Sequence, residues 1–325
     1  MESGKRGRWR GLLLAAKLIV VALVTWGLWR NVSTAFDEAR ASGFSLWQLR
    51  PAWLALAGLL YILGMLPMGW FWHRLLLAMG QRPRLAATLR AYYLGHLGKY
   101  VPGKVLVVVL RTGAIRGEGV AVTPAAVAVF LETLTMMAVG AAIAAAIIAA
   151  RFGAQRSLLI LSLILMVLAG IPTLPPVARR IVVLLRIDRA DRSVNDLLRG
   201  VNWRVMAIGW LSNLVGWTLL GLSLWATLRA LPLVDGMLAT GVSTHLLLMA
   251  AVSLAVVAGF LSLLPGGIGV REWVLMPLLA VQMQLGELVA VVAAISLRLA
   301  WLLSEVIVSV ILYLAVSNRS KRESG

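Results

Sequence analysis

Two lysines flank a helix-breaking Pro-Gly pair inside an apolar stretch. Lys99 and Lys104 lie on either side of Pro102-Gly103, and lysines make up only five of the 31 basic residues of the chain. Pro and Gly together interrupt a helix, and the N–H groups exposed at half-helix ends favour anions, as ammonium groups do. This break therefore predicts a site for a phosphate-bearing headgroup. The alternative is that both lysines merely extend to the membrane interface.

A second break of the same kind follows later in the chain. Pro265-Gly266-Gly267 is followed by Arg271 and Glu272, which are opposite charges next to each other. Closely spaced glycines permit a near approach of backbone or ligand. The pattern is not a dinucleotide-binding fingerprint, because it lacks a third correctly spaced glycine and a βαβ setting. We include the break in the candidate site, and a purely structural tight turn is the alternative.

Further charges lie within apolar segments, at Arg111, Glu132, Arg298 and Glu305. A charge at the bilayer centre costs about 2.5–3.5 kcal/mol on insertion scales, so such residues usually face an interior. Arg298 and Glu305 are seven apart and therefore share one helical face. We expect Glu132 and Arg298 to face one cavity from the two halves of the chain and to pair. The alternative is an ion pair that only holds helices together.

The elements that must position these residues are membrane helices. The chain is 61% hydrophobic with a mean hydropathy of +0.90, which predicts a single integral membrane domain over residues 1–325, all-α and polytopic. About six full transmembrane helices are expected. They cover residues 12–29, 53–72, 124–150, 158–174, 205–228 and 287–316. Two further apolar regions, 86–110 and 237–285, carry the breaks and are predicted to be broken or re-entrant helical hairpins.

Loop charges predict the orientation. The linker 175–204 carries seven arginines, whereas loops 30–52, 151–156 and 229–236 carry three, two and one. The positive-inside rule then places this linker and both termini in the cytoplasm. The half-repeats 53–150 and 205–316 would each contain span, hairpin and span with opposite orientation, which is the pattern of an inverted repeat. Charge does not decide whether residues 237–285 are re-entrant or cross fully.

Composition also excludes several classes of function. The chain has no Cys, and its three His are scattered, so neither a metal site nor a cofactor is predicted. The net charge of +18 lies mainly in short loops beside apolar spans, which indicates membrane topology and not nucleic-acid binding. Membrane lipids are the expected partners, and a homo-oligomer remains open.

Taken in order, the segment 98–104, Arg111, Glu132 and the segment 264–272 resemble the membrane region of bacterial lysylphosphatidylglycerol synthases, the flippase part of the multiple peptide resistance factor. The similarity covers residues 10–316. It implies paired re-entrant elements and movement of lipids between leaflets. By this match the candidate headgroup contacts are Lys99, Lys104, Arg111, Glu132, Arg271 and Glu272, whereas Arg298 and Glu305 rest on the intramembrane-charge argument alone.

We therefore expect a lipid flippase or transporter in the bacterial cytoplasmic membrane, acting on a lipid with a polar or phosphate-bearing headgroup. Enzymatic activity is not expected, because the chain stops at Gly325 without the soluble aminoacyl-transferring domain of the synthases. One alternative is an intramembrane transferase, with His96, Glu132 and Glu272 as candidate bases. The other is a membrane scaffold that recruits a partner through the linker 175–204.

Overall fold

The computed structural model describes residues 48–100, 105–152, 170–184, 197–239, 241–262 and 264–323, together with positions 26, 29, 30, 33, 37, 160, 164 and 167. Within these residues every regular element is helical. The expected span 12–29 lies almost entirely outside the described residues, and so does most of the span 158–174. Pro102, Gly103 and Lys104 also lie outside them.

Five described helices contain a segment long and apolar enough to cross a membrane. They are α2 (Pro51–Ala78), α5 (Val122–Phe152), α9 (Trp203–Arg229), α10 (Val242–Leu261) and α12 (Glu287–Glu323). Local sequence defines their starts. The proline that begins α2 needs no N–H partner there, and the Asn202 side chain accepts a hydrogen bond from the backbone of Val205 at 3.1 Å at the start of α9. The prediction of an all-α polytopic membrane protein is confirmed.

The first break separates two short helices that pack against each other. α3 (Leu85–His96) continues into the 3₁₀ turn η2 (Leu97–Tyr100), and α4 (Val105–Ile115) follows the break. Each helix is about 17–18 Å long, well short of the ~30 Å hydrocarbon core. Gly98 permits the close contact, since a Cβ atom there would lie 2.7 Å from the backbone nitrogen of Val107. The chain thus forms a helical hairpin over the predicted region 86–110.

The second break follows a longer helix. α10 is followed by the 3₁₀ turn η7 (Pro265–Gly267), the short helix α11 (Val270–Pro277) and the π-helical turn η8 (Leu278–Gln282). Gly267 and Gly269 have φ values of +69° and +78°, which favour glycine. The 20 residues of α10 span about 30 Å, enough to cross the hydrocarbon, whereas α11 is far too short.

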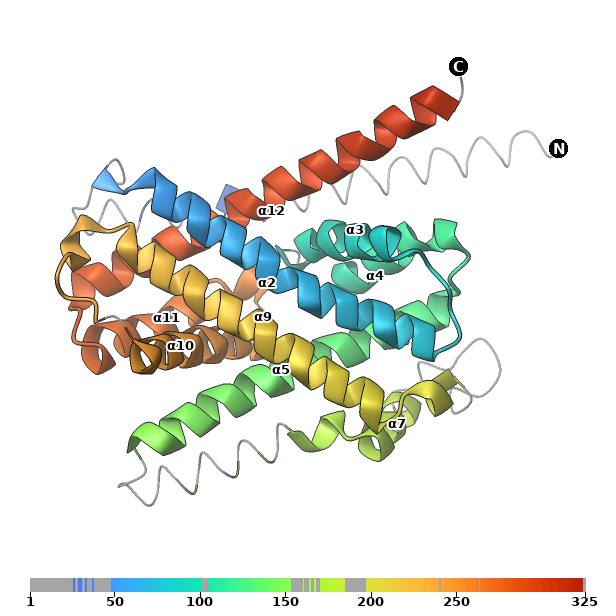
Figure 1. The fold of residues 1–325 in the computed structure, drawn as a ribbon, viewed down its shortest axis with the longest axis horizontal. Coiled ribbons are helices and arrows are strands. Elements are labelled where there is room, and N and C mark those ends of the chain that lie inside the picture. Colours follow the sequence, from blue (N-terminus) through green and yellow to red (C-terminus); the bar gives the residue numbers. More distant parts are fainter. Residues whose placement is uncertain are drawn as a thin grey trace.

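The two hairpins flank a central pair of long helices. α2 and α9 pack closely because Gly64 lies against Gly216. A Cβ atom added at Gly216 would lie 2.9 Å from the carbonyl oxygen of Gly64. In Figure 1, α3 and α4 lie toward one end of this pair and α10 and α11 toward the other, while α12 and α5 lie on opposite sides of it. The turns η2 and η7 contact each other between the two ends.

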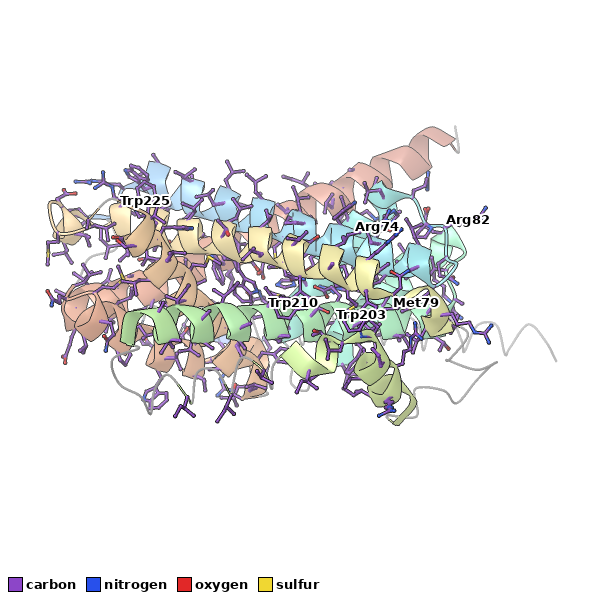
Figure 2. All side chains as sticks on the ribbon, turned by 60° about the horizontal axis from the view of Figure 1, so that its bottom comes forward. Arg74, Met79, Arg82, Trp203, Trp210 and Trp225 are labelled. Carbon is purple, nitrogen blue, oxygen red and sulfur yellow. The ribbon has the colours of Figure 1, made fainter. Side chains whose placement is uncertain are left out.

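Aromatic and basic side chains mark the two ends of the bundle. Arg74, Arg82 and Trp203 lie toward one end and Trp225 toward the other (Figure 2). Trp225 packs edge-on against Trp53 with ring centroids 5.4 Å apart. Such rings suit the polar–apolar boundary of a bilayer, so the long helices run from one boundary to the other.

Candidate functional site

The tips of both hairpins meet at the middle of the molecule. η2 carries Lys99 and Tyr100, and η7 carries Gly266 and Gly267, with Arg271 one turn further on. Lys99, Gly266 and Arg271 line the same two adjoining cavities, so residues more than 160 positions apart in sequence form one site. The structure therefore brings the residues just before the first predicted break into contact with the second break.

The Glu305 carboxylate on α12 joins three elements at this centre. It accepts a hydrogen bond from the Tyr100 hydroxyl at 2.8 Å, and it is also bonded by the Lys99 ammonium and the Tyr61 hydroxyl. His96 Nε2 lies 3.1 Å from the Tyr61 oxygen. Glu305 is only 5% exposed. Several donors compensate its lost hydration, which makes a buried carboxylate tolerable.

A second buried ion pair links the first hairpin to α5. Arg111 Nη1 lies 2.7 Å from Glu132 Oε2, and the Tyr92 hydroxyl donates to Glu132 Oε1 at 2.9 Å. The Arg111 guanidinium also lies 3.9 Å from the Tyr92 ring centroid. The two charged side chains are 3% and 1% exposed, so this pair is closed off from solvent.

A third ion pair lies at the second break. Arg298 Nη1 donates to Glu272 Oε1 at 2.8 Å. The predicted pairing of Glu132 with Arg298 is therefore wrong, because each has a nearer partner in its own half of the chain. The adjacent Arg271 and Glu272 do not pair either, since consecutive helical residues point about 100° apart. The other carboxylate oxygen, Glu272 Oε2, is buried and has no hydrogen-bond partner among the described residues.

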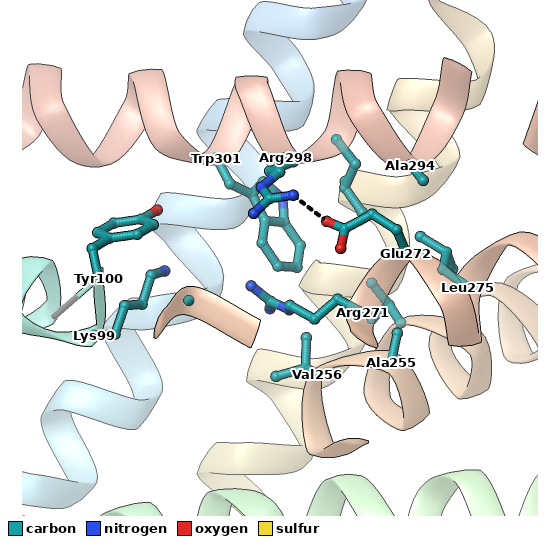
Figure 3. A pocket seen from close by; sticks show the side chains of 13 residues that line it. Lys99, Tyr100, Ala255, Val256, Arg271, Glu272, Leu275, Ala294, Arg298 and Trp301 are labelled. Carbon is teal, nitrogen blue, oxygen red and sulfur yellow. Dashed lines mark hydrogen bonds and ion pairs between the residues drawn. The ribbon is translucent and has the colours of Figure 1, made fainter. Parts of the chain in front are cut away.

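Arg271 is held by packing. Gly259 and Gly267 lie against the aliphatic part of its side chain. A Cβ atom added at Gly259 would lie 2.3 Å from Arg271 Cγ, and one added at Gly267 would lie 2.8 Å from Arg271 Cδ. Its guanidinium lies 5.3 Å from the ring centroid of Trp301. Figure 3 shows the side chain extending between Lys99 and the Arg298–Glu272 pair. No carboxylate of the described residues forms an ion pair with Arg271.

Two cavities adjoin at this arginine. The larger, of about 320 Å³, has a mainly apolar wall from α4, α5 and α10, and the smaller, of about 30 Å³, is more polar. Lys99, Arg271 and Trp301 line both, whereas Glu272 and Arg298 line only the smaller one. An apolar chamber thus opens onto a cluster of fixed charges, which is the general character of a binding site for an amphipathic ligand.

Sequence comparison matches residues 12–308 to the family described as the lysylphosphatidylglycerol synthase TM region. The chain belongs to this family. No curated protein matches the sequence. Membership of the lysylphosphatidylglycerol synthase TM family indicates a function related to membrane lipids, and the matched region is the membrane part, which contains no catalytic domain.

The structure of this family member places the described members of the predicted site at or beside the two cavities, whereas Pro102, Gly103 and Lys104 lie outside the described residues. Pro265 begins η7 next to them, and Glu305 bonds to Lys99 at their edge. The contacts that the sequence prediction missed are aromatic: Tyr61, Tyr92 and Tyr100 donate to the buried carboxylates, and Trp301 lies against Arg271. A tyrosine in the middle of an apolar span, such as Tyr61, was the available signal, because its hydroxyl needs a partner there.

Proposed function

We propose that this protein moves a lipid with a polar or phosphate-bearing headgroup between the two leaflets of a membrane. The observation that carries the proposal is the contact between η2 and η7. The turn that leads into the first break and the turn of the second break, one in each half of the chain, meet at a buried cluster of cations. In a membrane, irregular backbone is tolerated where protein or a water-filled cavity satisfies its polar groups.

The arrangement of the two halves supports transport. Residues 53–150 and 205–316 each supply long helices around one broken hairpin, and the hairpins approach the centre from opposite ends of the α2–α9 pair (Figure 1). If both hairpins are re-entrant, the two halves form an inverted repeat, and the site lies at the midplane between them. Many secondary transporters place their substrate there and move one half against the other.

The roles of the residues follow from their contacts. Arg271 and Lys99 bind the headgroup, because both line the two cavities. The pairs Arg111–Glu132 and Arg298–Glu272 fix the walls, and Glu305 holds Lys99 in position. The apolar chamber receives part of a lipid chain. We propose that Pro102, Gly103 and Lys104 complete the same site at the first break.

The transferase alternative has less support from the geometry. Two of its candidate bases, Glu132 and Glu272, each form an ion pair with an arginine, which occupies one of the two carboxylate oxygens. His96 would be left as the base, and its Nε2 contacts the Tyr61 hydroxyl. The scaffold alternative rests on the linker 175–204, of which residues 185–196 lie outside the described part.

Reconstitution in vesicles tests the transport proposal. The purified protein should accelerate the exchange of fluorescent phospholipids between leaflets, followed by chemical quenching of the outer leaflet. Arg271→Ala should slow this exchange at least about tenfold, because charge-assisted contacts of an arginine are worth about 1.5–3 kcal/mol. Arg84→Ala removes an exposed arginine far from both cavities and should leave the rate unchanged. Equal rates for Arg271→Ala and the wild type would refute the proposal.

A further inference from the structure

The charges at the two cavities do not balance. Four cations among the described residues lie there, and three of them have a carboxylate partner: Lys99 pairs with Glu305, Arg111 with Glu132 and Arg298 with Glu272. Arg271 is the fourth, and none of the described carboxylates pairs with it. The described part of the site therefore has a net charge of +1, located on a side chain that opens into both cavities.

The packing around Arg271 favours the binding of an anion. The glycines at 259 and 267 leave no room for a Cβ atom beside its stem, and Trp301 lies against its guanidinium, so packing holds the group in place before any ligand binds. A guanidinium whose position is fixed in this way binds phosphate with little loss of side-chain entropy. Its planar array of N–H donors also matches two phosphate oxygens at once.

The smaller cavity favours a different chemical group of the ligand, a hydrogen-bond donor. Glu272 is 7% exposed, and its Oε2 atom lacks a hydrogen-bond partner among the described residues, although Oε1 is bonded to Arg298. A buried acceptor without a partner costs free energy, so a donor from a ligand would be stabilised there. A cavity of about 30 Å³ has room for about two water-sized groups, which suits hydroxyls and not a whole phosphate.

An ammonium group is the less suitable donor. The charge of Glu272 is already neutralised by Arg298, and Arg271 and Lys99 line the same small cavity. A ligand cation would add a positive charge beside the net charge of +1 on Arg271, without gaining a free carboxylate among the described residues. Repulsion of this kind discriminates against a ligand as effectively as a missing contact. A neutral hydroxyl satisfies Glu272 Oε2 without that penalty.

We infer that the site selects a polyol phosphate ester with one net negative charge: Arg271 binds the phosphate, and Glu272 Oε2 accepts a hydrogen bond from a headgroup hydroxyl. This inference rests on the proposed lipid transport and specifies its substrate class. The apolar chamber beside Arg271 points to a lipid as the carrier of this group, not a free polyol phosphate. Headgroups with an ammonium are expected to bind more weakly.

Competitive binding measured by native mass spectrometry tests the inference on the full-length protein. The probes share their acyl chains and differ in headgroup: phosphatidylglycerol, phosphatidylethanol, phosphatidylethanolamine and lysyl-phosphatidylglycerol. Phosphatidylethanol has the same single negative charge as phosphatidylglycerol but no hydroxyl. The wild type should bind phosphatidylglycerol at least about tenfold more than either ammonium lipid, and about ten- to a hundredfold more than phosphatidylethanol, the range expected for one hydrogen bond to a charged group.

Variants separate the two contacts. Arg271→Gln should abolish the preference for anionic over ammonium lipids, whereas the matched control Arg84→Gln should keep it. Glu272→Leu removes the acceptor without offering another polar group to the hydroxyl, so it should retain the anion preference and lose the advantage of phosphatidylglycerol over phosphatidylethanol. The wild-type order of the four lipids needs no variant and remains decisive if Glu272→Leu does not fold.

Three results would overturn the inference. They are equal binding of phosphatidylglycerol and lysyl-phosphatidylglycerol, equal binding of phosphatidylglycerol and phosphatidylethanol, and displacement of phosphatidylglycerol by equimolar soluble glycerol 3-phosphate. The vesicle assay distinguishes the two proposals. Lipid exchange without headgroup preference would refute the inference and keep transport, whereas the predicted preference without lipid exchange would refute transport and keep the binding site.

Discussion

Two of the three buried carboxylates of the site, Glu132 and Glu305, are each matched by a cation and by a tyrosine hydroxyl. Glu132 is bonded by Arg111 and Tyr92, and Glu305 by Lys99, Tyr61 and Tyr100. In a medium without water, an ionised group persists only when its partners replace hydration almost completely. Glu272 lacks this second partner, which is why it stands out as a binding group and the other two carboxylates as structural ones.

Removing one member of the Arg111–Glu132 pair should be costly. Glu132→Ala leaves the Arg111 charge buried without compensation, and the expected loss is about 3–5 kcal/mol in the free energy of unfolding. The double replacement of Arg111→Met with Glu132→Leu should recover most of this loss, because no charge then remains buried. Unfolding in detergent, titrated with a denaturant, measures both differences.

The exposed Arg50–Asp235 pair is the control for this measurement. Its two side chains are 44% and 53% exposed, so Asp235→Ala should change stability by less than about 1 kcal/mol. A comparably small effect of Glu132→Ala would mean that the Arg111–Glu132 pair is hydrated.

At the scale of elements, glycine determines how closely the two arms of the first hairpin pack against each other. η2 lies against α4 at Gly98, where an added Cβ atom would meet the backbone of Leu106 and Val107 at 2.7–2.9 Å. Backbone atoms do not move aside as the end of a flexible side chain does. The position of Lys99, the next residue, therefore depends on this contact.

Gly98→Ala should force η2 away from α4. We expect a loss of about 1–3 kcal/mol in unfolding free energy, as for other overpacked sites, together with slower lipid exchange because Lys99 shifts. Gly113→Ala is the matched control in the same hairpin, since nothing lies within 4 Å of its added Cβ atom. It lies within α4 and should be neutral or stabilise the protein by about 0.4–1 kcal/mol. If both variants behave alike in the unfolding and exchange assays, the close contact at Gly98 has no energetic role.

At the scale of the whole molecule, the two ends of the bundle carry different loops. The connection that follows α2 lies at one end, and the connection that follows α9 lies at the other (Figure 1). By their positions in the sequence, Arg82 belongs to the first connection and Met237 to the second. The arginine-rich linker 175–204 joins α9 at the first of these ends. The positive-inside rule predicts that this end faces the cytoplasm.

Single cysteines can test this orientation directly, because the chain has none of its own. Arg82→Cys and Met237→Cys replace exposed residues at the two ends. In intact cells a membrane-impermeant maleimide should label Met237→Cys, whereas Arg82→Cys should be labelled only after the membrane is opened. Labelling of both positions in intact cells would contradict a full crossing of the helices between them, and the reverse pattern would invert the proposed orientation.

Hydropathy was sufficient to predict the all-α membrane fold, which the structure confirms. The Pro-Gly breaks and the charges in apolar segments also singled out residues that the structure gathers around the two cavities. These features depend on local sequence, because segments that cross a bilayer are long apolar helices, and charged residues or helix breaks within them are energetically unfavourable. The sequence alone also pointed to residues such as Arg271 and Glu305, since charges are rare in apolar segments.

Only the tertiary structure decided which of these charges pair. Glu132 could in principle meet Arg111 or Arg298, and the pattern of charges is the same in both cases. The packing of α4 against α5 and of α11 against α12 selects the partners, which come from helices adjacent in sequence. Distance in the folded molecule sets the Coulomb energy, and spacing along the chain does not determine it. That is why the lack of a carboxylate partner for Arg271 among the described residues, the basis of the substrate inference, became visible only in the structure.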